Sequence, residues 1–424
     1  MTALPRLIRV RQNFTPQPPL DLHAAIDAGL ERLRPRIASG ARIAVGVGSR
    51  GISHLARIVE MVLAQLRAAG ARPFILPAMG SHGGATPEGQ REVLASYGIT
   101  EAAMGVPIAA SLEVTQVGTT SGGAPVFCST EALGADGILL VNRIKPHTDF
   151  FGPLGSGLLK MTVIGLGKRA GATAMHEAAM RLGYEPAIRT MAAALLRAAP
   201  VLGGLAILEN QFHDTSKIVA VLRDEMESAE SALLAESRTL MPLLPFDEID
   251  LLIVDRIGKN ISGTGLDPNV IGRSIHGYSS MLMRTGAASP FIRRIFVRDL
   301  TPETHGNAIG IGMADATTTR LVDAMDRRVS YINALTALTP QSAKLPIHFD
   351  TDREAIERML GSLALANPAE ARVVRIADTL SLAEIEVSEA LWRERRADGD
   401  LTMLGEAREL SFDTEGNLPA AFGV

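Results

Sequence analysis

Basic side chains, imidazoles and glycines gather between Arg143 and His176. The stretch holds two histidines, three lysines, two arginines and six glycines. Cations on a flexible backbone favour a phosphate-bearing ligand, and nearby imidazoles can carry out acid/base chemistry. The alternative is a basic surface loop, which the glycines and the flanking apolar residues disfavour.

A second candidate is His82, which lies in the glycine-rich run from Met79 to Gln90. The run connects an expected strand to a helix that Thr86 and Pro87 should begin as N-cap and first residue. Loops of this kind stand at the carboxyl edge of an open α/β sheet, where ligands bind. We therefore expect a functional role for His82, although a lone loop histidine is often only solvated.

Gly46, Gly48 and Gly51 form a G-x-G-x-x-G turn between a strand and a helix. This is the context of a dinucleotide-binding fingerprint, which also needs an acidic residue at the end of the second strand. Here that strand ends in Leu-Pro-Ala-Met-Gly, without an acid, and the turn contains Arg50. Three interpretations stay open: an anion-binding turn that uses Arg50, NAD binding, and a plain strand-to-helix turn.

In the second half of the chain, Lys259 lies in the segment 255–265, which begins at the end of an expected strand. The lysine could reach a cleft between two domains, a favoured place for small-molecule sites, but a solvated lysine fits the pattern almost as well. His305 is placed in a similar way and is a weaker candidate.

Short apolar runs alternate with helical patterns, which predicts an α/β fold of two domains with mainly parallel sheets and an active-site cleft between the domains. Pro242 and Pro245 mark the expected boundary, giving domains 1–245 and 246–424. The expected strands are 42–47, 73–77, 137–142, 204–208, 250–256, 294–297 and 372–376. The expected helices are 53–69, 86–97, 315–327 and 382–396.

Composition narrows the class of protein. The 424 residues carry a net charge of −4 and only 4% aromatic residues, so a nucleic-acid partner is not expected. Cys128 is the single cysteine, which excludes a disulfide framework and a multi-cysteine metal cluster. We see no signal peptide and no apolar stretch of the ~20 residues that a membrane span needs. The expected location is cytoplasmic, with no membrane partner.

The order of these motifs resembles the nickel-dependent lactate racemase family. The resemblance rests on a Gly-Ser-Arg turn, a Gly-Ser-His-Gly-Gly loop, the loop of His147, a Gly-Ser-Gly-Leu-Leu-Lys segment and His176, 16 positions after Lys160. It covers the first domain well and the second loosely. The acidic residue that the family carries just before its arginine turn is absent here.

The resemblance implies an isomerase, a racemase or epimerase that inverts C2 of a small-molecule 2-hydroxy acid with a nickel-pincer nucleotide. His82 and His147 match the two acid/base histidines, and Arg50 matches the arginine that holds the substrate carboxylate. Lys160 matches the lysine that anchors the cofactor, beside Gly155 and Gly157, and His176 matches the nickel ligand.

Two lysines are matched less firmly. Lys259 is a looser match to an active-site lysine of the second domain. Lys168 is a rival cofactor-binding lysine, and beside Arg169 we expect it to be solvated or to face a phosphate. The alternatives to a racemase are an NAD-dependent oxidoreductase built on the Gly46-Gly48-Gly51 turn and a non-catalytic nucleotide-binding protein. The sequence leaves open which acid is bound and whether the chain forms a homo-oligomer.

Overall fold

The computed structural model describes residues 4–48, 51–148, 150–275 and 290–419. The chain divides into two compact units: an N-terminal unit of residues 17–241 and a C-terminal unit of residues 1–16 and 242–424. The boundary at 241/242 lies close to the expected one at 245/246. Residues 1–16 differ from the expectation, because they belong to the C-terminal unit.

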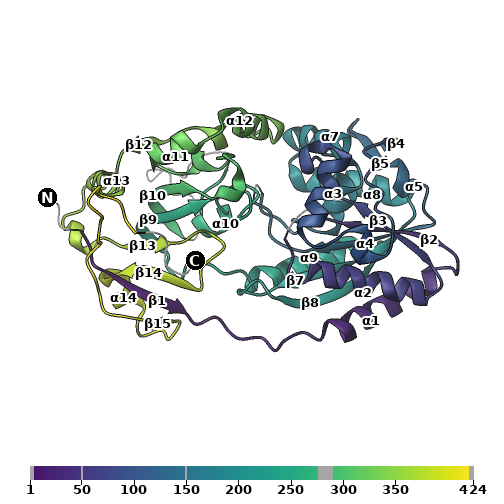
Figure 1. Cartoon of the computed structure of the whole chain (residues 1–424), viewed down its shortest axis with the longest axis horizontal. Helices are drawn as coiled ribbons and strands as arrows, with labels where there is room; N and C mark the ends of the chain where they lie inside the picture. The colour runs from purple at the N-terminus through teal and green to yellow at the C-terminus, as the bar shows by residue number, and fades with distance from the viewer. Residues whose placement is uncertain (1–3, 49–50, 149, 276–289, 420–424) are drawn as a thin grey trace. The chain divides into compact units, whose positions relative to one another are not determined.

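The N-terminal unit contains a five-stranded sheet with the order β3-β2-β6-β7-β8 (Figure 1). Neighbouring strands from β3 to β7 are parallel, and β8 is antiparallel to β7. The elements of this unit are α1 (Leu22–Leu33), β2 (Arg42–Val47), α2 (Leu55–Ala68), β3 (Arg72–Pro77), α3 (Pro87–Ser96), α4 (Glu101–Met104), β4 (Val114–Thr119), β5 (Pro125–Ser129), α5 (Thr130–Leu133), β6 (Gly137–Arg143), α6 (Leu158–Lys160), the π-helical segment η3 (Met161–Gly165), α7 (Lys168–Leu182), α8 (Tyr184–Ala198), β7 (Val201–Glu209), β8 (Thr215–Leu222) and α9 (Met226–Thr239).

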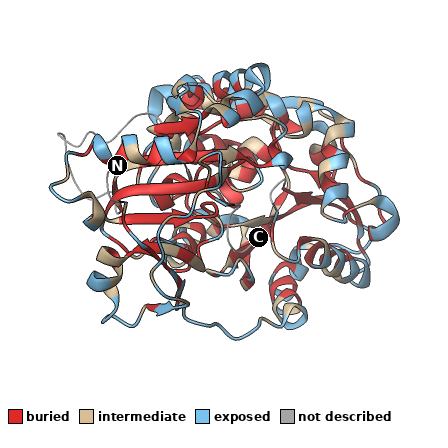
Figure 2. Ribbon diagram, turned by 60° about the vertical axis from the view of Figure 1, so that its left-hand side comes forward, coloured by how far each residue is buried: buried red, intermediate tan, exposed pale blue. Residues whose placement is uncertain are grey.

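Side chains on alternate positions of these strands enter two different cores. On β6, Leu139 and Val141 pack with α1 and α2, whereas Ile138 and Leu140 pack with α6 to α9. Because both faces of the sheet are covered, β2, β3 and β6 are buried nearly throughout. Figure 2 shows the buried residues of the whole chain in red, many of them in strands. Such strands read as continuous apolar runs, which is why the sequence predicts them well.

The C-terminal unit contains an eight-stranded sheet with the order β12-β11-β10-β9-β13-β14-β1-β15. The strands from β12 to β13 are parallel, and β14, β1 and β15 continue the sheet antiparallel. The elements of this unit are β1 (Leu7–Gln12), β9 (Glu248–Ile257), α10 (Pro268–Ile271), β10 (Phe291–Leu300), β11 (Ala316–Thr318), α11 (Thr319–Ala324), α12 (Arg327–Thr336), β12 (Ile347–Phe349), α13 (Asp352–Gly361), β13 (Val373–Ile376), β14 (Glu384–Ser388), α14 (Glu389–Arg395) and β15 (Leu401–Met403).

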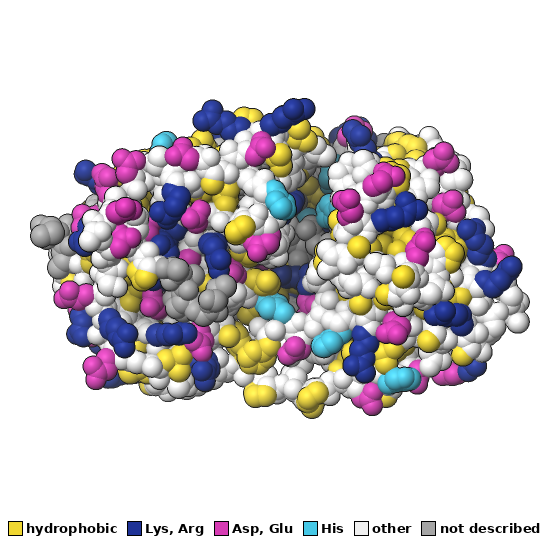
Figure 3. All heavy atoms as spheres, in the orientation of Figure 1, with side chains coloured by type: hydrophobic (Ala, Val, Ile, Leu, Met, Phe, Trp, Pro, Cys, Tyr) yellow, Lys and Arg dark blue, Asp and Glu magenta, His cyan; other side chains and the backbone are white. Residues whose placement is uncertain are grey.

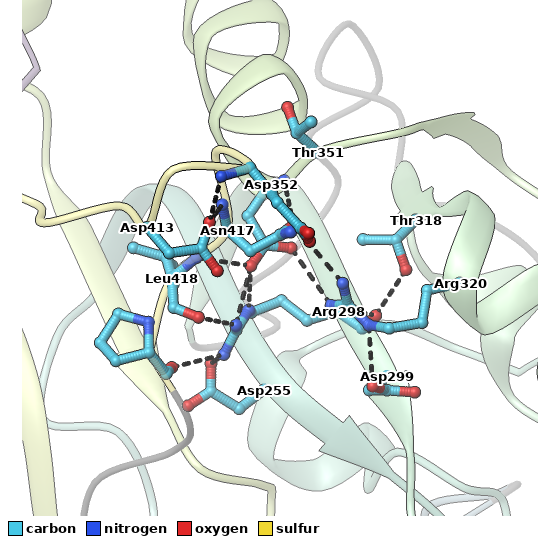
Figure 4. Close-up of polar contacts among 12 residues, drawn as sticks. Asp255, Arg298, Asp299, Thr318, Arg320, Thr351, Asp352, Asp413, Asn417 and Leu418 are labelled. Carbon is cyan, nitrogen blue, oxygen red and sulfur yellow. Dashed lines mark hydrogen bonds and ion pairs between the residues drawn. The ribbon is translucent and has the colours of Figure 1, made fainter.

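A buried ion network crosses the strands of the C-terminal unit (Figure 4). Asp255 on β9 accepts hydrogen bonds from Arg298 on β10 at 2.7 Å and from Arg375 on β13 at 3.0 Å. Arg298 also donates to Asp352 at 2.8 Å and to the carbonyl of Leu418 at 2.7 Å. These charged side chains are at most 8% exposed, so the network ties three strands to the C-terminal segment inside the core.

Two expected helices begin too early. Residues 316–318 of the expected helix 315–327 form β11, and residues 384–388 of the expected helix 382–396 form β14. In both cases a strand runs directly into a short helix, so the apolar positions of the strand merged with those of the helix in the sequence pattern. The seven expected strands and the helices 53–69 and 86–97 are confirmed within a few residues.

Acidic and basic side chains alternate over the face that Figure 3 shows, without a patch of one sign. This mixture agrees with the small net charge of −4. Within the described part of the chain, no helix combines the length and apolar character needed to cross a lipid bilayer.

Candidate functional site

The sheet order of the N-terminal unit decides which candidate residues share one edge. His82 follows β3, the glycine turn follows β2 and His147 follows β6, and β2 lies between the other two strands. Because these strands are parallel, all three loops leave the carboxyl edge of the sheet. Two strand spacings, about 10 Å, separate the ends of β3 and β6. Arg50 itself lies outside the described residues.

The loop of His147 is closed at its base. Lys145 and Ser156 exchange two backbone hydrogen bonds of 2.9 Å. Gly155 is required beside this closure, because a Cβ there would lie 2.7 Å from the carbonyl oxygen of Lys145. The His147 ring is buried and stacks on Phe150 with a ring-centroid separation of 4.4 Å. The imidazole is therefore held by packing in a closed loop.

Lys160 ends α6 and contacts this histidine. Its Nζ atom lies within hydrogen-bond distance of His147 Nε2, and the lysine itself is half-buried. Phe150 stacks in turn on Tyr184, the first residue of α8, with centroids 5.0 Å apart. An amine and an imidazole thus meet at the carboxyl edge of the sheet against an aromatic wall.

The backbone just before Lys160 is held from two sides. Asn142, near the end of β6, donates from Nδ2 to the carbonyl of Gly157 at 2.9 Å. Glu230, on α9, accepts a 2.9 Å hydrogen bond from the amide of Leu159. Burial raises the pKa of Glu230 to about 7, and the backbone amides of Leu159 and Leu158 oppose that rise. The sequence analysis did not single out Asn142 or Glu230.

The loop of His82 packs on the elements that follow Lys160. A Cβ on Gly80 would lie 2.8 Å from Ile164 Cγ2 and 3.8 Å from Ala172 Cβ. Gln90, buried on α3, donates to the carbonyl of Gly80 at 3.1 Å. Thr86 begins α3 as expected, since its hydroxyl accepts from the amide of Gly89 at 3.1 Å. His82 is therefore in a loop that is fixed against both η3 and α7.

His176 is half-buried on α7 and shares a helix face with Ala172, one turn earlier. That is the face on which the loop of His82 packs. On one straight helix, Lys160 and His176 would be about 24 Å apart. The helix is interrupted between them, because Lys168 has a φ of +54°. A non-glycine residue rarely adopts this conformation, so α7 starts in a new direction there.

The expected solvent exposure of Lys168 is wrong. The side chain has 0% exposure and donates from Nζ to the carbonyl of Pro77 at 2.6 Å. Burial lowers the pKa of Lys168 to about 8, opposed by the charges of Cys128 and Glu131. In this structure Lys168 fastens the start of α7 to the end of β3 and has no surface to offer to a ligand.

The lowered pKa of Lys168 predicts a pH dependence of stability. The folded protein binds this proton more weakly than the unfolded chain, so the free energy of unfolding should rise with pH. Between about pH 7.5 and 9 we expect the wild type to gain about 1 kcal/mol relative to Lys168→Met. Urea unfolding of both proteins measures this difference. A constant difference over that range would show that Lys168 is not held with a lowered pKa.

The turn after β2 is fastened to β6 and β7. The carboxylate of Glu209, at the end of β7, accepts from the amide of Ser53 at 2.8 Å and pairs with Arg143. Arg143 also donates to the carbonyl of Gly51 at 3.4 Å, and Thr215 donates to the carbonyl of Ser53 at 2.9 Å. A carboxylate from β7, two strands away from β2, therefore binds this turn directly and also through Arg143.

This arrangement disfavours NAD binding at the Gly46-Gly48-Gly51 turn. A dinucleotide places its pyrophosphate on the amides at the start of the helix, where Glu209 already holds the amide of Ser53. Gly46 has a packing role, since a Cβ there would lie 2.8 Å from Leu140 Cδ2. The amide at the start of the helix and Gly46 therefore both have structural roles that do not involve a dinucleotide.

In the C-terminal unit, Lys259 stands on a tightly held loop. Its Nζ donates to Asn333 Oδ1 at 2.9 Å and to the carbonyl of Gly263 at 3.1 Å. Gly265 and Gly310 allow two loops to interlock, because a Cβ on either would lie within 2 Å of a backbone oxygen of the other loop. The catalytic role of Lys259 and the expected cleft between the domains stay predictions.

No group of three or more His, Cys, Asp or Glu side chains that could hold a metal ion occurs among the described residues. Cys128 is buried, and burial raises the pKa of its thiol to about 12.

Two comparisons bear on the class of this protein, which is an α/β protein of two units with mainly parallel sheets. Residues 21–185 match the family model of the lactate racemase N-terminal domain. The lactate racemase apoprotein from Thermoanaerobacterium thermosaccharolyticum has a similar fold, with a TM-score of 0.51 and 14% identity over 89% of this chain and 99% of that chain. A protein from Thermotoga maritima is also similar, with a TM-score of 0.52 and 12% identity over 85% and 97% of the two chains.

No curated protein matches the chain significantly. Residues 21–185 are similar to the N-terminal domain of lactate racemases, and the chain has a fold similar to that of a lactate racemase apoprotein. The resemblance expected from the sequence is confirmed at this level. At these identities, the structural likeness shows the fold and not the activity.

Proposed function

We propose that the protein is a racemase or epimerase that interconverts the two configurations at C2 of a 2-hydroxy acid. The contact between His147 and Lys160, inside the segment that matches the lactate racemase N-terminal domain, carries this proposal. It unites an acid/base group with an amine at the carboxyl edge of the sheet. A non-catalytic nucleotide-binding protein would have no need of a packed imidazole at that position.

The two histidines have the chemistry that inversion needs. An imidazole titrates near neutral pH, so it can take the proton of the C2 hydroxyl group or return it. His82 and His147 follow strands on either side of β2, so each can serve one face of a planar 2-keto intermediate. Arg50, on the turn after β2, is assigned to the substrate carboxylate, because a guanidinium binds a carboxylate through two parallel hydrogen bonds.

The ligand set of the chain fits a nickel-pincer nucleotide. Lys160 is half-buried beside His147 and can attach a cofactor through its amine, while the imidazole of His176 suits nickel(II). When bound, such a cofactor supplies an acceptor and donor for the hydrogen at C2 as hydride. The protein then has to hold the carboxylate, move the hydroxyl proton and keep water from the reacting carbon.

The attachment of the cofactor predicts a specific covalent adduct. Peptide mass mapping of the holoprotein should find the adduct on the peptide that contains Lys160, and Lys160→Ala should abolish it. Lys168→Met should keep the adduct, because Lys168 has no exposed surface. An adduct on Lys168 would reverse the assignment of the two lysines.

The activity is tested with single enantiomers of a panel of 2-hydroxy acids, deuterated at C2, and nickel-loaded enzyme. We expect the optical configuration to invert while deuterium stays at C2. Loss of deuterium to water would instead mean that an imidazole removes C2 hydrogen as a proton. If no acid in the panel changes configuration despite full nickel loading, the racemase proposal is wrong.

A further inference from the structure

Glu230 is a fully buried carboxylate that the proposed chemistry does not use. It lies on α9, and its Oε2 atom accepts the hydrogen bond from the amide of Leu159. Its Oε1 atom is buried without a hydrogen-bond partner. Burying a carboxylate in this way is costly, so it needs a compensating role.

Gly157 is shaped to receive this carboxylate. A Cβ at that position would lie 2.4 Å from the carboxyl carbon of Glu230. The φ of Gly157 is −162°, an extended conformation that any residue can adopt. The backbone conformation therefore does not require glycine at position 157. Glycine is required there because the Glu230 carboxyl group lies so close.

The contact lies in the same short helix as the amine of the candidate site. Lys160 follows the amide that Glu230 binds, in the same first helical turn, and its Nζ contacts His147. We propose that Glu230 is a positioning residue, which caps this turn from α9 and thereby holds Lys160 against His147. The cofactor role of Lys160 rests on the proposed function, but the capping does not, so the two can fail separately.

Hydrogen exchange of the cofactor-free protein tests the cap. The exchange is measured at about pH 8.5, above the pKa of about 7 of Glu230, so that this group is charged. Glu230→Gln then keeps the shape and removes the charge, and charge-assisted hydrogen bonds are roughly twice as strong as neutral ones. Exchange of the amides at 158–161 should accelerate on the order of tenfold, while other segments stay unchanged. Glu236→Gln, on the same helix in an exposed ion pair with Lys217, is the matched control and should change nothing at 158–161.

The position of the Lys160 amine is tested in a separate experiment, competitive labelling with acetic anhydride. In Glu230→Gln, the labelling rate of Lys160 should change at least about threefold relative to that of the exposed Lys344. Unchanged exchange at 158–161, acceleration spread evenly over the N-terminal unit, or an unchanged labelling rate of Lys160 would each overturn the proposal.

A double-mutant cycle keeps the test valid if one variant folds poorly. Gly157→Ala should lower the ratio of folded to unfolded protein, and this loss should be at least roughly fivefold larger in the wild type than in Glu230→Ala, where the carboxyl group is gone. Equal effects in the two backgrounds would show that residues 157 and 230 do not interact, and the proposal would fall.

Discussion

Replacing either His82 or His147 by Gln should abolish racemisation in both directions, with a loss of at least about 10³-fold in kcat/KM. Each inversion uses one imidazole to take the hydroxyl proton and the other to return a proton on the opposite face. Because the reverse reaction exchanges these roles, neither direction can proceed with a single histidine. The measurement is the initial rate of change in optical rotation, starting from each pure enantiomer.

His23→Gln provides the matched control. His23 is an exposed histidine on α1 that pairs with Asp27 at 3.3 Å. This variant should retain the full rate in both directions. A histidine variant at 82 or 147 that retains a kcat/KM close to that of the wild type would contradict the two-base mechanism.

Removing the carboxylate of Asp255 should produce the largest loss of stability. Asp255 is 1% exposed and binds two buried guanidinium groups, those of Arg298 and Arg375. Figure 4 shows the pair with Arg298. Asp255→Asn leaves these cations without a full counter-charge, and breaking a buried ion pair costs about 3–5 kcal/mol. The free energy of unfolding from urea titration of the full chain measures the effect.

The neighbouring residue Asp299 shows what an exposed ion pair contributes. It pairs with Arg320 at 2.9 Å, and its side chain is 36% exposed. We expect Asp299→Asn to cost less than about 1 kcal/mol, because water screens exposed charges. Similar losses in the two variants would mean that the network around Asp255 does not stabilise the C-terminal unit as proposed here.

The sequence predicts the elements that are buried on both faces and misses those that are not. β2 and β6 read as apolar runs, because helices cover both sides of their sheet. The sequence pattern does not predict β1, because this strand has only six residues and its exposed positions carry arginines. Its partners, β14 and β15, lie almost the whole length of the chain away, so no local pattern assigns it to the C-terminal unit.

The residues of the candidate site also fall into those that the sequence predicts and those that it does not. His82 and His147 are recognisable because they follow buried strands, and parallel topology places such loops at one edge. The exposure of Lys168 is predicted wrongly, because the adjacent Arg169 indicates a solvent-exposed segment. In the structure, Lys168 has a positive φ and its side chain is buried in the core. Glu230 carries no local signal, since its partner Gly157 belongs to a distant segment of the chain.

The pairing of β1 with β14 and β15 makes the N-terminal unit an insertion within the other one. During synthesis, residues 17–241 emerge as one uninterrupted piece and can fold before the rest of the chain exists. The C-terminal sheet must wait for the final strands before β1 gains both its partners. A protein cut at the boundary near 245 would therefore separate β1 from its sheet, whereas a fragment of residues 17–241 would leave both sheets with all of their own strands.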